Sequence, residues 1–271
     1  MTGPAAAVAA APRPAVARAA AAVAALRQRI AAQHAAGAPG LATCSLASDL
    51  VDAIVVDVWE AALADLTPDA AEAVRLRTAA VAIGGWGRRE MFPFSDVDLM
   101  FLHAGRAPAA LAAVAKRVLQ DLFDAGLQVG QSVRGIAEAC GLAAGDATIM
   151  SALLDARPVA GDATLVERLA SRIRGLVRRG RRRTAERLIV ARREEAERFG
   201  RTVALLEPNV KRSPGGLRDI QLAHWLGIVL DDAATWDDLA RAGGLTRADA
   251  AALRDAAEFL ARVRIDLHLA A

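Results

Sequence analysis

The chain lacks tyrosine, contains two cysteines and four histidines, and takes nearly all of its positive charge from arginine, with only two lysines. Cys44 and Cys140 cannot build the disulfide framework of a small secreted domain, and so few cysteines and histidines exclude a Cys/His zinc cluster. No apolar run approaches the roughly 20 uninterrupted residues that a membrane-spanning helix needs. These absences favour a reduced, cytoplasmic protein that has no membrane partner.

The rest of the composition is that of a folded chain. With 271 residues and 54% hydrophobic content, the chain is long enough for one large domain or two smaller ones. The net charge is only +3, but residues 168–201 carry thirteen arginines against four glutamates. Such a segment is either a surface for a polyanion or the solvated face of long helices. Because Phe199 is its one aromatic residue, it lacks the stacking platform of a nucleic-acid surface, and we interpret it as a solvated helical face.

The order of the expected elements indicates an α+β fold. Residues 1–25 are interpreted as a frayed N-terminal arm and not a signal peptide, because three prolines interrupt them and no basic segment opens them. Helical periodicity runs from about residue 163 onward, and a loop at 207–219 interrupts it. The expected elements before it are helices over 15–35, 46–65 and 108–125 and strands over 78–85, 96–103 and 127–134. The expected domains are an N-terminal arm with helices (1–70), an α/β domain (71–165) and a helical domain (166–271).

A glycine pair and two aspartates form the densest polar motif of the chain. Gly84 and Gly85 close one expected strand, and Asp96 and Asp98 lie on the next. The glycines let the backbone approach a ligand and turn into a short helix, whose free N–H groups favour phosphate. Side chains alternate along a strand, so the two carboxylates project from the same face with Cβ atoms roughly 6 to 7 Å apart. At that distance two anions repel each other by roughly 2 to 3 kcal/mol.

A divalent cation would remove this repulsion. Mg²⁺ is typically held by one or two carboxylates together with substrate phosphates, and an Asp-x-Asp pair that faces a glycine-rich turn provides that arrangement. Such ions activate an attacking oxygen and stabilise a leaving pyrophosphate. Taken singly, a glycine pair is a common turn and an Asp-x-Asp pair is often a solvated strand edge. Together, with a strand before each, they predict metal-assisted nucleotidyl transfer.

The same segment resembles a known family signature. GGWGRREMFPFSDVDLMFL (84–102) is similar to the motif of the DNA polymerase β-like nucleotidyltransferase superfamily, in the form found in bacterial uridylyltransferases of the PII nitrogen-signalling protein. LEPNVKRSPGGLRDIQLAHWLG (206–227) resembles the loop and helix that follow the catalytic domain in that family, and LQVGQSVR and SALLDARPVAGD lie between them in family order. The similarity spans about residues 28–269. It implies a polymerase β-like domain with a small mixed sheet, flanked by an N-terminal helical segment and a C-terminal helical domain.

Carried over to this sequence, the resemblance implies roles for the motif residues. Asp96 and Asp98 are the expected catalytic residues and Mg²⁺ ligands, and Ser95 is expected to orient the turn before them. The loop at 207–219 offers cationic side chains and backbone N–H groups, so it either closes over phosphates, holds the partner, or is a plain turn between helices. We interpret Trp86 as a core residue. The residues expected to bind the nucleotide are Gly84, Gly85, Gly87, Arg88, Ser95, Lys211, Ser213, Gly215, Gly216 and Arg218.

The sequence departs from the family pattern at the third carboxylate. Related proteins usually carry an acid on the strand after the long helix, where this chain has Gln128 and Gln131. A neutral amide does not replace the charge of an anionic metal ligand. Either Asp155 or Asp219 is therefore the candidate third acid, and Asp155 alternatively pairs with Arg157.

The chain also departs from the family in length. Family members continue into an HD phosphohydrolase domain, which removes the uridylyl group, and into ACT domains, which sense glutamine. This sequence has no His-Asp dipeptide, and its four histidines stand singly. The helical pattern from Arg247 to Ala271 carries no stop signal, so we expect a truncated chain that lacks both kinds of domain.

The resemblance therefore implies Mg²⁺-dependent transfer of UMP from UTP to a tyrosine hydroxyl of a PII-like protein, with release of pyrophosphate. Two alternatives stay open. One is a non-catalytic nucleotide-binding or regulatory module, which Gln128 and Gln131 favour. The other is an adenylyltransferase that acts on glutamine synthetase, or a related enzyme that modifies RNA.

Overall fold

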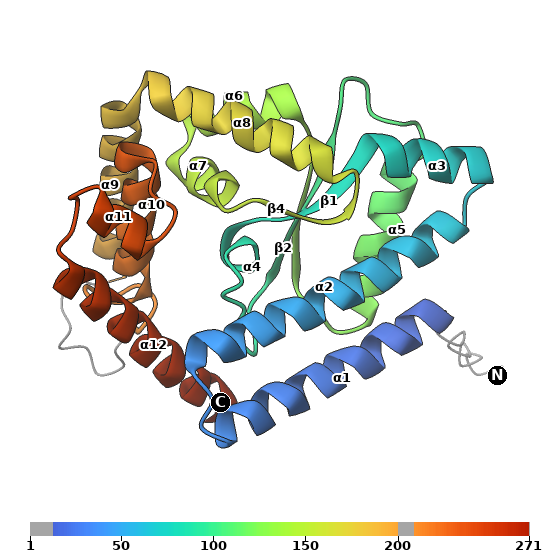
Figure 1. Ribbon diagram of the computed structural model, residues 1–271. Coiled ribbons are helices and arrows are strands. Elements are labelled where there is room, and N and C mark those ends of the chain that lie inside the picture. The colour runs from blue at the N-terminus through green and yellow to red at the C-terminus, as the bar shows by residue number, and fades with distance from the viewer. Residues whose placement is uncertain (1–12, 200–208, 271) are drawn as a thin grey trace, which may run out of the picture.

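The structure is a computed structural model that describes residues 13–199 and 209–270. Residues 1–12 of the expected N-terminal arm, and Glu207 and Pro208 of the expected loop, lie outside the described residues. Figure 1 shows a small central sheet, with two long N-terminal helices along one side of it and the helices of the C-terminal half around the other. The two halves of the sequence therefore meet at the sheet.

The sheet is mixed. β1 pairs with β2 and β4 in antiparallel fashion, whereas β2 and β3 are parallel. A parallel pair needs a crossover connection, and here a long helix provides it. This small mixed sheet with its surrounding helices confirms the expected α+β class. The strands lie in the order β3 (Val129–Gly135), β2 (Val97–His103), β1 (Thr78–Ala82) and β4 (Arg157–Gly161), and the crossover helix is α5 (Leu111–Asp124).

The strand β4 is an addition to the three expected strands. It contains Pro158 and ends at Gly161, so its sequence alone is that of a turn. Proline is tolerated at a sheet edge, where its missing N–H is not needed. β4 is such an edge strand, and its pairing with β1 shifts register between Ala80 and Val81.

The N-terminal helices cover one face of the sheet. Apolar side chains of α1 (Pro14–Ala35), α2 (Gly40–Ala64) and α5 form one continuous core with β1 and β2. Within it, Trp59 of α2 stacks on Phe101 of β2, with ring centroids 6.0 Å apart. The structure also adds a short helix, α3 (Pro68–Arg77), between α2 and β1.

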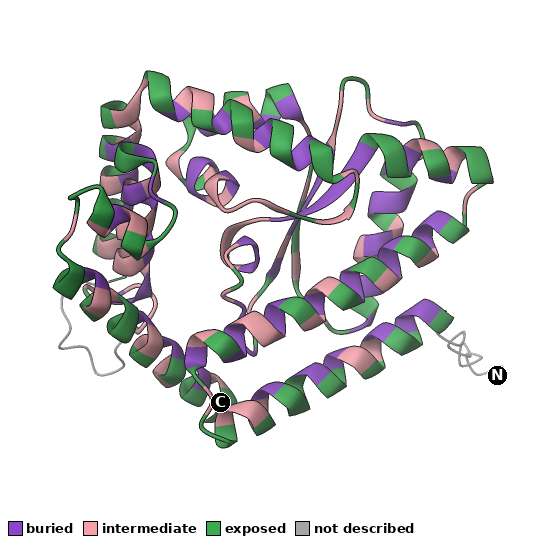
Figure 2. Ribbon diagram, in the orientation of Figure 1, coloured by how far each residue is buried: buried purple, intermediate pink, exposed green. Residues whose placement is uncertain are grey.

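Helices of the second half cover the other face. Buried side chains of α8 (Ala163–Arg179), among them Leu165 and Leu169, pack against Val81 and Met100 of the sheet. Buried and exposed residues alternate around α8 (Figure 2), and its arginines lie on the exposed side. The interpretation of this segment as a solvated face holds for α8. The remaining helices are α4 (Gly84–Gly87), α6 (Ile136–Gly145), α7 (Ala147–Leu154), α9 (Arg181–Arg198), α10 (Leu217–Asp231), α11 (Trp236–Arg241) and α12 (Arg247–Ala270).

The last helix is fastened to the beginning of α2. The carboxylate of Glu258 on α12 accepts hydrogen bonds from the backbone N–H groups of Gly40 and Leu41, the latter at 3.0 Å. A Cβ atom on Gly40 would lie 2.7 Å from the backbone nitrogen of Arg262, so only glycine permits this contact. The acceptor from α12 explains why α2 begins at Gly40, ahead of the expected start at residue 46. Within the described ranges, no helix has both the length and the apolar composition needed to cross a bilayer.

Candidate active site

The carboxylate of Asp98 occupies a slot between two glycines. Gly84, in the turn after β1, has φ +59°, and a Cβ atom there would lie 3.0 Å from Oδ2 of Asp98. Gly130 is the register partner of Asp98 on β3, and a Cβ atom there would lie 3.1 Å from Oδ1. Gly84 and Gly130 therefore leave room for the Asp98 carboxylate, and a side chain at either position would displace it.

Both aspartates line one cavity of about 140 Å³, which we call the acid cavity. Asp96 lies directly before β2 and Asp98 within it, and Gly85 and Ser95 form part of the same wall. The opposite wall comes from the C-terminal half of the chain. Its cationic residues are Lys211, Arg218 and Arg264.

Both acids of this cavity, and its cations Lys211 and Arg264, lack an ion-pair partner among the described residues, whereas Arg218 lies 3.5 Å from Glu195. Within the described residues, neither Asp96 nor Asp98 has a side-chain hydrogen bond or ion pair. Burial raises the pKa of Asp98, and the neighbouring charge of Asp96 raises it further, while Lys211 and Arg218 lower it. Burial, together with the charges of Arg264 and Arg218, lowers the pKa of Lys211 to about 8. Two unpaired acids face a group of crowded cations, a combination suited to a metal ion and a polyphosphate.

The comparisons with known proteins agree with this geometry. The family described as GlnD PII-uridylyltransferase matches residues 183–271, and the family described as putative nucleotidyltransferase DUF294 matches residues 24–133. A bifunctional uridylyltransferase/uridylyl-removing enzyme of Aromatoleum aromaticum is 38% identical over 222 residues, which cover 81% of this chain and 24% of the relative. Over most of its length the chain is therefore similar to PII-uridylyltransferases, and both family models that match it describe nucleotidyltransferases.

Further relatives carry the same name. The protein of Erythrobacter litoralis is 39% identical over 221 residues, covering 81% of this chain and 24% of the relative. That of Bordetella parapertussis is 39% identical over 188 residues, covering 69% of this chain and 22% of the relative. The chain thus spans about a quarter of the length of the curated uridylyltransferases it matches.

The structure brings together seven of the residues expected at the uridylyltransferase site. They are the residues of the acid cavity that the sequence had already singled out: Gly85, Arg88, Ser95, Asp96, Asp98, Lys211 and Arg218. Gly84 touches the site through Asp98. The other expected residues shape the backbone, since a Cβ atom on Gly87 would lie 2.3 Å from the carbonyl oxygen of Asp155. Ser213, Gly215 and Gly216 belong to the turn that ends in α10, where the hydroxyl of Ser213 accepts from the backbone N–H of Asn209.

That turn fixes the position of Lys211. The backbone N–H groups of Leu217 and Arg218 donate to the carbonyls of Val210 and Lys211 at 3.0 and 2.9 Å. Gly215 has φ +75°, a backbone conformation that glycine adopts readily. The loop is therefore a tight turn between helices and at the same time a source of one cation of the acid cavity.

Arg88 lines the acid cavity, but its charge is already compensated. Its guanidinium donates to Glu90 at 2.9 Å and to Asp155 at 2.7 Å, and lies 5.3 Å from the ring of Trp225 on α10. Trp225 also donates from Nε1 to Asp155 at 2.9 Å. The side chains of Arg88 and Asp155 are only 8% and 3% exposed. This buried pair ties the glycine turn to α10.

Neither candidate third acid lies in the acid cavity. Asp155 is engaged by Arg88 and Trp225, and its alternative partner Arg157 instead pairs with Asp52 at 2.6 Å. Asp219 accepts from Arg192 and from the backbone N–H of Gly215, both at 2.6 Å. The described residues hold no group of three acids, histidines or cysteines that would bind a metal. Local ion pairs therefore occupy both carboxylates outside the acid cavity, and the third acid stays a prediction.

Trp86 is a core residue, as expected. It is fully buried, and its Nε1 donates to Asp52 at 2.8 Å. The same carboxylate accepts two hydrogen bonds from Arg157, at 2.6 and 2.8 Å. The indole therefore anchors the glycine turn to α2 and β4.

Two polar residues on the helical side of the acid cavity, Gln221 and Arg264, were not expected from the sequence. Gln221 of α10 is buried and donates to Glu90 at 2.7 Å, while it accepts from Arg218 at 2.7 Å. Arg264 of α12 lies 4.1 Å from the ring of Phe92. The signal available for Arg264 was an arginine among apolar positions of a helix, which is also typical of an ordinary surface. Arg264 reaches the acid cavity because α12 packs on α2, a long-range contact that the sequence pattern does not show.

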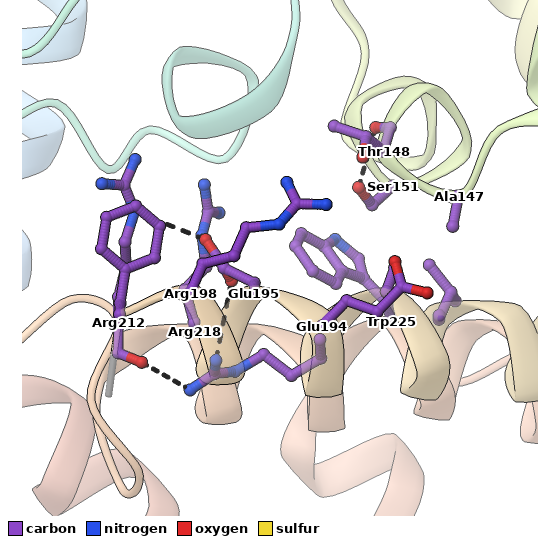
Figure 3. Close-up of a pocket in the computed structure, with 13 residues that line it drawn as sticks. Ala147, Thr148, Ser151, Glu194, Glu195, Arg198, Arg212, Arg218 and Trp225 are labelled. Atoms are coloured by element: carbon purple, nitrogen blue, oxygen red, sulfur yellow. Dashed lines mark hydrogen bonds and ion pairs between the residues drawn. The ribbon is translucent and has the colours of Figure 1, made fainter. Parts of the chain in front are cut away.

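A larger cavity of about 370 Å³ lies beside the acid cavity, between α7, α9 and α10. Figure 3 shows Thr148 and Ser151 on one side of it and Glu194, Arg198 and Trp225 on the other. Arg218 lines both cavities. Here the solvated-face interpretation of the arginine-rich segment fails for one residue: Arg192 is 8% exposed, because it bonds Asp219 and the carbonyl of Arg212.

Proposed function

We propose that this chain catalyses Mg²⁺-dependent transfer of UMP from UTP to a tyrosine hydroxyl of a PII-like protein, with release of pyrophosphate. The observation that carries the proposal is the acid cavity, where two unpaired carboxylates from the sheet face Lys211, Arg218 and Arg264 from the helical half. The curated relatives are named uridylyltransferases, which supports UMP as the transferred group.

The residues present fit a magnesium ion. Asp98 is held in its glycine slot, Asp96 faces the same cavity, and no protein cation of the described residues neutralises either carboxylate by direct contact. Mg²⁺ tolerates a site of one or two carboxylates because phosphate and water oxygens complete its shell. When bound there, the ion would supply charge stabilisation and activation of the attacking oxygen.

The protein residues have distinct parts in the proposed reaction. Asp96 and Asp98 would hold the metal ion at the edge of the sheet, and the backbone at Gly84 and Gly85 leaves room for a phosphate next to it. Lys211 and Arg218 offset the negative charge of the triphosphate before the reaction. The same cations stabilise the charge that develops on the leaving pyrophosphate, where preorganised donors contribute most.

Transfer assays test the proposal. The chain is incubated with Mg²⁺, radiolabelled UTP and a PII protein, and the label is followed on PII. We expect labelling with the unmodified chain, and a loss of at least about a hundredfold with Asp98→Asn, because removal of one metal-binding charge removes much of the electrostatic stabilisation. Asp255→Asn, an exposed acid on α12, is the matched control and should label PII normally.

The same experiment separates the alternatives. The four nucleoside triphosphates are compared on PII, on glutamine synthetase and on RNA. Labelling of another acceptor, or a preference for ATP, would contradict the proposal. Binding of UTP by calorimetry without any transfer would instead support a regulatory nucleotide-binding module.

A further inference from the structure

Lys211 and Arg264 form a cationic pair without an acidic partner. Within the described residues, neither side chain makes an ion pair, and the Arg264 guanidinium lies over the Phe92 ring. Both side chains are partly buried. Burial, followed by the charges of Arg264, Arg218 and Arg212, lowers the pKa of Lys211 to about 8. Burial, together with the charges of Arg218 and Arg212, lowers the pKa of Arg264 to about 10, although Cys44 and Glu90 act in the opposite direction. Removing an unpaired cation from water costs free energy, so a bound anion would stabilise this pair.

A second cavity adjoins the acid cavity at this pair. It has a volume of about 410 Å³ and lies between the turn before α10 and the end of α12; we call it the α12 cavity. Lys211 and Arg264 line both cavities. Arg212 and His268 also line the α12 cavity, and no acid belongs to its described lining. The acid cavity is thus mixed in charge, whereas the charged side chains in the described lining of the α12 cavity are the cations Lys211, Arg212 and Arg264.

The position of Arg264 is fixed by the contacts of its helix. Glu258, six residues before Arg264 on α12, accepts hydrogen bonds from the first N–H groups of α2. Asp266 pairs with His34 at 2.5 Å just after it. Arg264 is therefore held at the junction of the two cavities before a ligand binds, which reduces the entropy that binding must overcome.

We propose that the α12 cavity holds the pyrophosphate half of the nucleotide, with Arg264 and Lys211 as its cationic ligands. This inference rests on the proposed function. In that reaction the acceptor oxygen forms a bond to the α-phosphorus as the α–β anhydride bond breaks. The electron pair of that bond leaves on pyrophosphate, and the hydroxyl proton passes to solvent. The α-phosphate lies beside Asp96 and Asp98, and the leaving group lies across the cationic pair, whose two positive charges offset part of its negative charge.

Calorimetry of the 271-residue chain with inorganic pyrophosphate, in magnesium-free buffer, tests the inference without any transfer reaction. We expect Arg264→Gln to weaken pyrophosphate binding about ten- to a hundredfold, because one charge-assisted contact is lost. UTP binding should weaken with it, whereas UMP binding should not change. Arg247→Gln removes the same charge from an exposed position of α12 and should bind pyrophosphate normally.

Arg264→Lys shows whether a change in affinity comes from lost charge or from a damaged fold. It keeps the cation but not the planar fork, so it should bind pyrophosphate between the unmodified chain and Arg264→Gln. Unchanged pyrophosphate affinity in Arg264→Gln, or an equal loss for UMP, would overturn the inference. If PII is not labelled while pyrophosphate binding still depends on Arg264, the result supports the anion site and contradicts the proposed function.

Discussion

A methyl group added at Gly84 would meet two obstacles, a backbone φ of +59° and the Oδ2 atom of Asp98 at 3.0 Å. Gly105 has nearly the same backbone, φ +57°, but open space around it. We therefore expect Gly84→Ala and Gly105→Ala to lose similar stability, about 1 to 2 kcal/mol, from the left-handed conformation. Only Gly84→Ala should lose nucleotidyl transfer, because only it displaces the acid. Urea unfolding and the PII labelling assay measure the two effects, and equal transfer by both variants would contradict the glycine slot.

The buried pair of Arg88 and Asp155 leads to a prediction on stability. In Asp155→Asn the guanidinium stays buried and loses one of its two carboxylate partners. Breaking such a pair from one side costs about 3 to 5 kcal/mol. Urea unfolding should show this loss, whereas Glu138→Gln, which breaks an exposed pair with Arg134, should leave the free energy of unfolding nearly unchanged. Equal stabilities of the two variants would show that Arg88 finds another partner.

At the same scale, the sequence predicts the residues of the site better than their roles. The Asp-x-Asp spacing and the alternation of a strand place Asp96 and Asp98 correctly, because both arguments are local. The partners of the two candidate third acids are not predicted, because the partner of a carboxylate comes from elsewhere in the chain. Asp155 meets an arginine of the glycine turn and a tryptophan of α10, and no sequence spacing encodes that meeting.

Among the elements, the contact between α2 and α12 sets the position of Arg264 in the acid cavity. Glu258→Gln keeps the size of the side chain but removes the charge that faces the N-terminus of α2. We expect a loss of roughly 1 kcal/mol in the free energy of unfolding. Pyrophosphate affinity should fall as well, because Arg264 loses its fixed position. Asp255→Asn, on the same helix, serves as the control in both measurements, and normal pyrophosphate binding by Glu258→Gln would contradict the positioning argument.

The same contact shows why some elements are hard to predict. The long helices and the strands β1, β2 and β3 follow from periodicity and from glycine and proline at their ends. The start of α2 depends on an acid from α12, and β4 depends on a pairing with β1 that tolerates Pro158 only at an edge. Elements completed by distant partners carry a weak local signal.

Across the whole molecule, the acids of the site come from the sheet and the cations from the helical half, so pH acts on the two sides differently. Lys211 has a pKa of about 8 in the free protein, and a bound anion raises it. Its contribution to anion affinity is therefore complete below pH 8 and declines as the pH rises above that value. Lys211→Arg stays charged throughout. The ratio of pyrophosphate affinities of Lys211→Arg and the unmodified chain should grow between pH 7 and pH 9, and a constant ratio would contradict the role of Lys211.

The link from Arg88 through Asp155 to Trp225 constrains how this architecture takes up a nucleotide. To swing α10 away from the glycine turn would separate a guanidinium and a carboxylate that both lie out of water, which is a steep energetic barrier. We therefore expect the glycine turn and α10 to stay in contact when a nucleotide binds, without an opening motion between the two halves of the chain. We also expect substrates to enter through the open side of the acid cavity. Phe94, which is 56% exposed, lines this cavity together with Asp96.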